Sequence, residues 1–184
     1  MRRLTLISTG GTIEKTYDEM TGVLANHQSI VQEMLGLLRL EDTAVNSIQL
    51  LSKDSNDLTD ADRARILAQV RLLIGPDNAR SDAAPDDSAS DGVIILHGTD
   101  TLAITGELLH TQLNGSPRVP VILTGAMRPF EMKRSDALQN LNEAIFAAGQ
   151  FTSGVWCVAH GRALPFPGVV KDRSIGTFVP AANA

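Results

Sequence analysis

The sequence predicts an α/β protein of three layers, in which a mainly parallel sheet lies between two layers of helices. Short apolar segments alternate with longer segments of helical period, and this alternation is typical of strand–helix–strand crossovers. The apolar segments are almost continuously hydrophobic, as in strands that are buried on both faces. A chain of 184 residues with 43% hydrophobic content suits one core. We therefore expect a single domain.

Five strands and four helices follow from these patterns. The expected strands are Leu4–Ser8, Ile48–Ser52, Val93–His97, Val119–Thr124 and Val155–His160. The expected helices are Ser29–Leu38, Thr59–Ile74, Thr101–Leu113 and Ser135–Ala148. Thr59 and Ser135 are the expected N-caps, and Gly36 weakens the first helix. Together these elements predict a doubly wound, flavodoxin-like sheet.

Composition excludes several classes of function. The net charge is −5 and the basic residues are scattered, so nucleic acid is not an expected partner. The apolar runs are much shorter than the ~20 residues that span a bilayer, and the N-terminal apolar stretch lacks a signal-peptide cleavage site. We expect a cytoplasmic protein without membrane insertion. The single cysteine, Cys157, lies in an apolar run and is expected to be a buried structural thiol, which leaves no internal disulfide.

One segment interrupts the regular pattern. Residues 76–91 are rich in Pro, Gly, Ser, Asp and Ala and offer almost nothing to bury. We expect a mobile, low-complexity insert between a helix and the third strand, with a partner-binding segment as the less favoured alternative.

Small and hydroxyl-bearing residues follow the expected strands. Open parallel sheets bind ligands at the carboxyl ends of their strands. The segments at these ends are Gly10-Gly11-Thr12, Asp54-Ser55-Asn56, Gly98-Thr99-Asp100, Gly125-Ala126-Met127 and, further on, Val170-Lys171-Asp172. The topology therefore gathers hydroxyls, a carboxylate and a lysine around one crevice.

Each loop also has a purely structural interpretation. Thr12 can begin a turn after two glycines, and Thr99 and Asp100 can cap the following helix. The set as a whole favours a catalytic interpretation, because a nucleophile needs a base and oxyanion donors beside it. Gly11 and Gly98 would let backbone N–H groups approach a substrate oxygen closely.

Rival motifs are absent from the sequence. The glycine turn is not followed by Gly-Lys-Ser/Thr and lacks the G-x-G-x-x-G spacing, so nucleotide binding is only a minor alternative. There is no G-x-S-x-G nucleophile elbow. The four histidines show no metal-ligand spacing, so we expect them to be structural or exposed and predict no metal site.

Three separated motifs resemble those of the bacterial L-asparaginase and glutaminase-asparaginase family, in its short single-domain form. They are Thr9-Gly10-Gly11-Thr12-Ile13, His97-Gly98-Thr99-Asp100-Thr101, and Gly125-Ala126-Met127-Arg128-Pro129 with Ser135-Asp136-Ala137. The segments at Asp54-Ser55-Asn56-Asp57 and Val169-Val170-Lys171-Asp172 resemble the family's substrate-carboxylate loop and lysine segment. The resemblance extends from residue 4 to about Phe178.

The resemblance implies a role for each of these residues. Thr12 would be the nucleophile, Thr99, Asp100 and Lys171 a second relay, and Tyr17 the tyrosine that polarises the nucleophile. The family often places this tyrosine further along the chain, on a flexible lid. Ser55 and Asp100 would hold the substrate's carboxylate and ammonium groups. The remaining implied substrate-binding positions are Gly11, Asp54, Asn56, Gly98 and Ala126.

The implied reaction is hydrolysis of L-asparagine through a threonine-linked acyl-enzyme, without a cofactor. Thr12 would lose its proton through Tyr17 or the Thr99–Lys171–Asp100 group, and N–H groups around Gly11 and Thr99 would stabilise the oxyanion. Two alternatives stay open: an ammonia-supplying amidotransferase subunit, and a non-catalytic amino-acid-binding regulatory domain. Family members often continue into a second, smaller domain, which we do not expect here, so we expect a homo-oligomer to complete the site.

Overall fold

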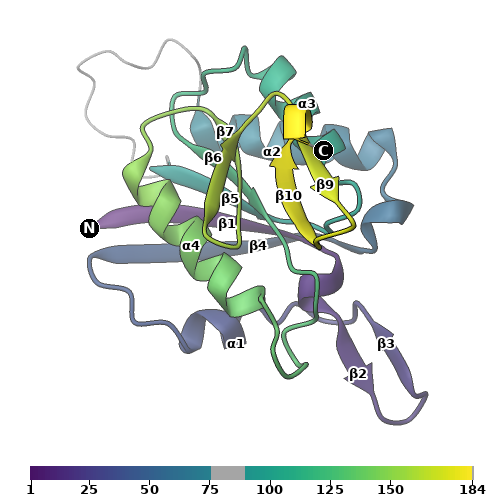
Figure 1. Ribbon diagram of the computed structural model, residues 1–184. Helices are drawn as coiled ribbons and strands as arrows, with labels where there is room; N and C mark the ends of the chain where they lie inside the picture. Colours follow the sequence, from purple (N-terminus) through teal and green to yellow (C-terminus); the bar gives the residue numbers. More distant parts are fainter. Residues whose placement is uncertain (76–89, 184) are drawn as a thin grey trace.

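The computed structural model describes residues 1–75 and 90–183 and contains one six-stranded sheet (Figure 1). Its strands are β1 (Arg2–Gly10), β4 (Thr43–Lys53), β5 (Gly92–Leu96), β6 (Val121–Thr124), β7 (Val155–Ala159) and β8 (Arg162–Pro165). The order across the sheet is β4-β1-β5-β6-β7-β8, and only the β7–β8 pair is antiparallel.

The five parallel strands, counted along the chain, therefore lie in the order 2-1-3-4-5. This is the flavodoxin-like order, and it confirms the predicted fold class. The direction of winding reverses between β1 and β5. A ligand crevice is expected where the carboxyl ends of these two strands diverge.

Helices cover both faces of the sheet. α1 (Val31–Gly36) and α4 (Ala137–Gln150) pack on one face, and α2 (Asp60–Ile74) and α3 (Leu102–Gln112) pack on the other (Figure 1). Alternate residues of β1 serve the two layers: Leu4 and Leu6 join the cluster under α4, and Ile7 joins the cluster under α2 and α3. The central strands are continuously hydrophobic because both faces of the sheet are buried.

The helix predictions are largely confirmed. Thr59 caps α2 through a capping box, in which its side chain accepts from the Asp62 N–H and the Asp62 carboxylate accepts from the Thr59 N–H. At α4 the predicted cap is one residue early, because Asp136 holds the N-cap position. The Ser135 hydroxyl still accepts from the Ala137 N–H at 3.0 Å.

The first helix is shorter than expected. It covers only six residues and ends at Gly36, whereas the sequence suggested a helix from 29 to 38. Glycine carries the largest conformational entropy cost of the residues that commonly occur in helices, so the chain leaves the helix at that point.

Four strand features escaped prediction, the first of which is β8, the antiparallel strand that follows β7. The edge strand β4 begins five residues earlier than expected, in a half-exposed polar stretch. Two short antiparallel hairpins were also missed, β2 (Thr16–Asp18) with β3 (Val23–Ala25) and β9 (Val169–Asp172) with β10 (Thr177–Pro180). Strands of three or four residues carry too few side chains for a clear alternating pattern. The short 3-10 turn η3 (Ala181–Asn183) follows β10.

Most of the predicted insert, residues 76–89, lies outside the described residues. Its last two residues were wrongly assigned to it, because they are packed against the amino end of β1. The Asp91 N–H donates to the Arg3 carbonyl at 2.8 Å, and the buried Ser90 hydroxyl donates to Thr5 Oγ1 at 2.8 Å.

Candidate functional site

The loop after β1 approaches the loop after β5 backbone to backbone. Gly10 and Gly11 have φ angles of +93° and +82°, which residues with a Cβ rarely adopt. A Cβ on Gly11 would lie 2.4 Å from Gly98 Cα, so this approach requires glycine. The chain then turns into η1 (Thr12–Glu14), which begins with the half-buried Thr12. The fold thus brings the Thr12 and Thr99 loops together at the switch point of the sheet.

The Gly11 N–H has a structural partner. It donates to the Lys53 carbonyl at 2.8 Å, which extends the pairing of β1 with β4. The Gly11 N–H is therefore engaged within the sheet, which leaves the neighbouring N–H groups as candidate oxyanion donors. Gly11 instead makes the close contact with the Gly98 backbone possible.

His97 supports the second loop from inside the core. One ring nitrogen, Nδ1, lies 2.8 Å from the Gly98 carbonyl, and the other, Nε2, lies 2.8 Å from Thr105 Oγ1. Burial lowers the pKa of His97 to about 4, so the ring is neutral near pH 7. A neutral ring has one N–H, which donates from Nδ1 to the carbonyl, and Nε2 accepts from the threonine hydroxyl. The expected structural role fits this arrangement.

Lys171 joins the two residues that follow Gly98. Its Nζ atom donates to Thr99 Oγ1 at 2.8 Å and to Asp100 Oδ1 at 2.9 Å. Thr99 is only 4% exposed, and Asp100 also pairs with Arg173 at 2.7 Å. The hydrogen bond from Lys171 holds the pKa of Asp100 below its usual value. The three relay residues named by the sequence therefore lie in direct contact, although 71 and 72 residues separate Lys171 from the other two.

The loop after β4 completes this edge of the sheet. Asp54 caps the 3-10 turn η2 (Ser55–Asp57) by accepting from the Asn56 N–H, and it pairs with Lys15 at 2.7 Å. The hydrogen bond from Lys15 lowers the pKa of Asp54. Asn56 Nδ2 reaches Asp100 Oδ2 at 3.4 Å. Asp54 thus has structural partners, while Asn56 connects this loop to Asp100.

Ser55 lies directly against the Gly98 backbone. A Cβ on Gly98 would be 2.5 Å from Ser55 Cβ and 2.6 Å from Ser55 Oγ. The Ser55 carbonyl accepts from Thr101 Oγ1 at 2.7 Å, which ties the two loops together. The loops after β1, β4 and β5 consequently form one compact unit.

Two expected site residues lie apart from this unit. Tyr17 is 57% exposed on the β2–β3 hairpin, which projects from the sheet (Figure 1), and its backbone N–H donates to Glu131 at 2.5 Å. Within the described residues its hydroxyl forms no hydrogen bond with Thr12. Ala126 is 1% exposed and packs in the core beneath α4, so only its backbone can face a ligand.

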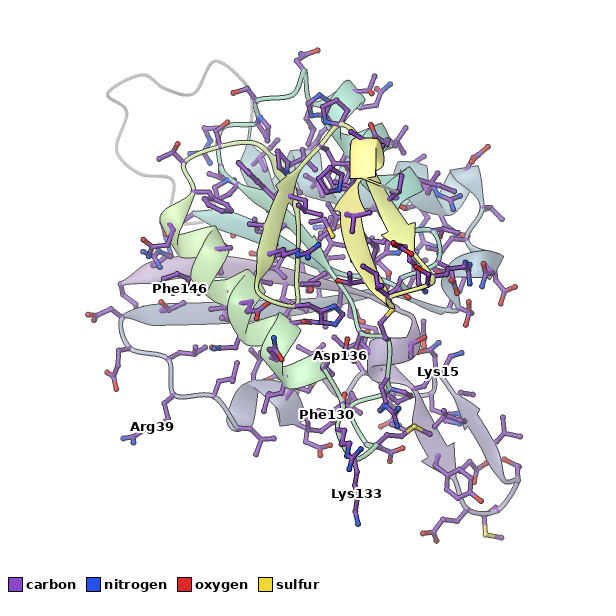
Figure 2. All side chains as sticks on the ribbon, in the orientation of Figure 1. Lys15, Arg39, Phe130, Lys133, Asp136 and Phe146 are labelled. Atoms are coloured by element: carbon purple, nitrogen blue, oxygen red, sulfur yellow. The ribbon has the colours of Figure 1, made fainter. Side chains whose placement is uncertain are left out.

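Several supporting residues were not identified from the sequence. Lys15 pairs with Asp54 from the base of the β2–β3 hairpin (Figure 2), and Arg173 adds a second cation at Asp100. A lysine shortly after the nucleophile motif and an arginine two residues after Lys171 are the only sequence signals for them. Basic residues at such positions are common on surfaces, so these signals are weak.

A histidine link fixes the hairpin that carries Lys171. His160 Nε2 lies 2.7 Å from Asp136 Oδ2 at the start of α4 (Figure 2), and its Nδ1 lies 2.8 Å from Thr177 Oγ1 in β10. Asp136 also accepts from the N–H groups of Met127 and Arg128. The Gly125–Pro129 segment and the Lys171 hairpin are therefore connected through one imidazole.

Neither a metal site nor a membrane span is evident in the part of the chain that the structure covers. Among residues 1–75 and 90–183, no three His, Cys, Asp or Glu side chains gather as metal ligands would. No helix in these ranges has the length and apolar character needed to cross a bilayer.

Sequence comparison places this geometry among known proteins. The family model for the N-terminal part of asparaginase matches residues 3–176. An L-asparaginase from Thermococcus kodakarensis is 29% identical over 174 residues, which cover 95% of this chain and 49% of that protein. A glutamyl-tRNA(Gln) amidotransferase subunit from Thermoplasma acidophilum is 32% identical over 150 residues, which cover 80% of this chain and 33% of that protein. The chain thus spans between a third and a half of these curated relatives.

Structural comparison agrees. The thermostable L-asparaginase from Thermococcus kodakarensis superimposes with a TM-score of 0.79 at 28% identity, over 97% of this chain and 51% of that one. A probable cytoplasmic L-asparaginase from Campylobacter jejuni gives a TM-score of 0.73 at 24% identity, over 98% and 52% of the two chains, and this likeness concerns the fold alone.

Proposed function

The chain belongs to the asparaginase family, and from this and the geometry of its strand ends we propose that it hydrolyses L-asparagine to aspartate and ammonia. The observation that carries the proposal is the contact of Lys171 with Thr99 and Asp100, beside the glycine turn that presents Thr12. A weakly acidic hydroxyl becomes a nucleophile when a proton-transfer group and a cation lie next to it. This site has both.

In the proposed reaction Thr12 Oγ1 attacks the side-chain amide carbon of the substrate. The proton of Thr12 passes to Thr99 as the Thr99 proton moves to the free amine form of Lys171, and the resulting ammonium group gives a proton to the departing nitrogen. The C–N bond then breaks, and ammonia leaves. Water then cleaves the aspartyl ester and restores the Thr12 hydroxyl. The exposed position of Tyr17 favours the Thr99–Lys171 route over a tyrosine route. Because the Gly11 N–H is engaged, the N–H groups of Thr12 and Thr99 are the proposed oxyanion donors.

The charged ends of the amino acid require partners of opposite charge. We assign the substrate's ammonium group to the Asp100 carboxylate and its carboxylate to the Ser55–Asn56 turn. Asn56 already touches Asp100, so the two subsites share one polar group. Glutamine is one methylene longer and should fit this spacing less well, so we expect weaker turnover of glutamine than of asparagine.

The decisive test is ammonia release by the purified chain from L-asparagine and, separately, from L-glutamine. Thr12→Ala should lower kcat by at least ~10³ while the far-UV spectrum stays unchanged, because the covalent route is lost. Thr43→Ala, at the opposite end of the sheet, is the matched control and should keep full activity. Near-normal turnover by a folded Thr12→Ala protein would exclude Thr12 as the nucleophile.

A second candidate follows from the relatives. The amidotransferase relative is as similar to this chain as the asparaginases are. In this alternative the chain also releases ammonia from an amide, and the ammonia is passed to a partner protein. An asparaginase releases ammonia alone, whereas an ammonia-supplying protein of this kind should be slow until its partner is added. We also propose a homo-oligomer in the cytoplasm, and its mass in solution tests the assembly.

A further inference from the structure

We propose that Glu14 is a positioning residue that fixes the glycine turn before Thr12 and couples this turn to the base of the β2–β3 hairpin. Its effect on activity rests on the proposed function, whereas its effect on the turn does not. Glu14 is 2% exposed and lies two residues after Thr12 in the same 3-10 turn. Its carboxylate accepts from Ser8 Oγ, from the Gly10 N–H at 3.2 Å and from Ser29 Oγ at 2.5 Å.

Burying the Glu14 carboxyl group costs free energy, because the group loses its contact with water. Within the described residues Glu14 forms no ion pair, and its partners are two hydroxyls and one backbone amide. Burial raises the pKa of Glu14 above its usual value of 4.5. A side chain that only filled space would be less costly if it were apolar. The cost indicates that the three hydrogen bonds serve a purpose.

The first purpose is to fix the turn. The Gly10 N–H donates to Glu14 Oε2, the Gly11 N–H donates to the Lys53 carbonyl, and the Glu14 N–H donates to the Gly11 carbonyl at 3.2 Å. Glycines at positive φ are free to adopt other conformations when nothing holds them. At the end of β1, the Glu14 carboxylate thus accepts the hydrogen bond of the Gly10 N–H, which the neighbouring strand does not accept.

The second purpose concerns the hairpin. The chain leaves the core at Lys15, forms β2 and β3, and returns at Ser29, whose hydroxyl bonds to Glu14 Oε1 and lies 3.4 Å from the Val31 N–H at the start of α1. Both ends of this excursion are therefore joined at the Glu14 carboxyl group. A displacement of the hairpin acts on Glu14 and, through Gly10, on the approach to Thr12.

Four variants separate this role from general stability. Glu14→Ala removes all three bonds. Ser29→Ala removes the bond between Ser29 and Glu14 together with the 3.4 Å contact to the Val31 N–H. Glu14→Gln keeps an acceptor and adds a donor that the serine hydroxyls can satisfy. Thr5→Val is the matched control, because it removes one buried hydroxyl bond, to Ser90, from the amino end of the same strand β1.

Two measurements are made on each full-length variant: kcat and KM for ammonia release from L-asparagine, and amide hydrogen exchange at residues 10–12 and 16–29. Glu14→Ala should lower kcat about 10²-fold, because small misplacements of reacting groups have effects of this size. Its exchange should accelerate in both segments. Ser29→Ala should accelerate exchange mainly in 16–29, Glu14→Gln should recover most of kcat, and Thr5→Val should leave both segments and kcat unchanged.

Each contrary outcome is informative. Wild-type exchange at residues 10–12 in Glu14→Ala overturns the proposal, and so does an equal loss of kcat in Thr5→Val. If Glu14→Ala does not fold, Glu14→Gln and Ser29→Ala are each compared with the wild type. Hydrogen exchange equal to that of the wild type in both segments, for both variants, contradicts the coupling. If the wild type releases ammonia from neither amide, the proposed function fails, and the exchange measurements still decide the role of Glu14.

Discussion

Replacing Lys171 by methionine tests the relay most directly. Methionine keeps most of the side-chain length but has neither charge nor donor. The change removes the 2.8 Å contact with Thr99 Oγ1 and the 2.9 Å contact with Asp100 Oδ1. Since general acid–base groups contribute about 10²–10⁴ to the rate, kcat should fall by that factor.

Stability should change little in the same variant. The Lys171–Asp100 pair is partly exposed, and pairs of this kind contribute at most about 1 kcal/mol to the free energy of unfolding. Arg173 still lies 2.7 Å from the same Asp100 oxygen and keeps that carboxylate compensated. The melting temperature should therefore stay within a few degrees of that of the wild type.

Arg173→Met is the matched control for charge. It removes a cation from Asp100 Oδ1 without touching Thr99, so it should alter KM for asparagine more than kcat. In steady-state assays of ammonia release, Thr99→Ala, Lys171→Met and the double variant should lose similar amounts of activity, because groups that act as a unit are not additive. Losses that multiply, or an Arg173→Met variant as slow as Lys171→Met, would refute the relay.

Three further predictions concern the remainder of the molecule. Thr59→Ala breaks the capping box with Asp62 and should reduce the free energy of unfolding in urea by about 0.5–2 kcal/mol without changing turnover; an unchanged unfolding midpoint would contradict this assignment. The pKa of Glu14 is raised in the folded state, so its protonated form stabilises the fold fully below pH 4.5, and this effect is lost as the pH rises through the folded pKa. With rising pH, the free energy of unfolding of the wild type should therefore fall relative to that of Glu14→Gln. Burial raises the pKa of the Cys157 thiol, which should react with a thiol reagent only on unfolding; fast labelling of the native protein would show that the thiol is accessible.

Sequence reasoning succeeded where a pattern was long or local. The 59–74 helix has a capping box and a continuous apolar face, and the central strands are buried on both sides, so both kinds of element could be assigned with their approximate bounds. It failed where tertiary contacts decide. The first half of β4 is strand because it pairs with β1 along the sheet edge, although its polar residues show no such preference.

The candidate site, too, was predicted where sequence patterns are local and missed where tertiary contacts decide. Topology alone placed Thr12, Ser55, Thr99 and Asp100 at one sheet edge, because parallel strands end there together. Lys171 was expected at the same crevice, and the family resemblance implied its role, but its contact with Thr99 depends on a hairpin that no periodicity indicated. Glu14 was overlooked, because a single acidic residue gives no sign in the sequence that its side chain turns inward.

The position of the β9–β10 hairpin outside the main sheet has a consequence for synthesis of the chain. All six strands of the main sheet, and the Thr12 and Thr99 loops, precede Lys171 in the chain and are therefore made before it. Lys171 follows on a separate pair of strands that pack through Val169 and Phe178. Domains begin to fold as they leave the ribosome, from the N-terminal side. The Thr12 loop is thus made before Lys171, which follows on a hairpin of its own.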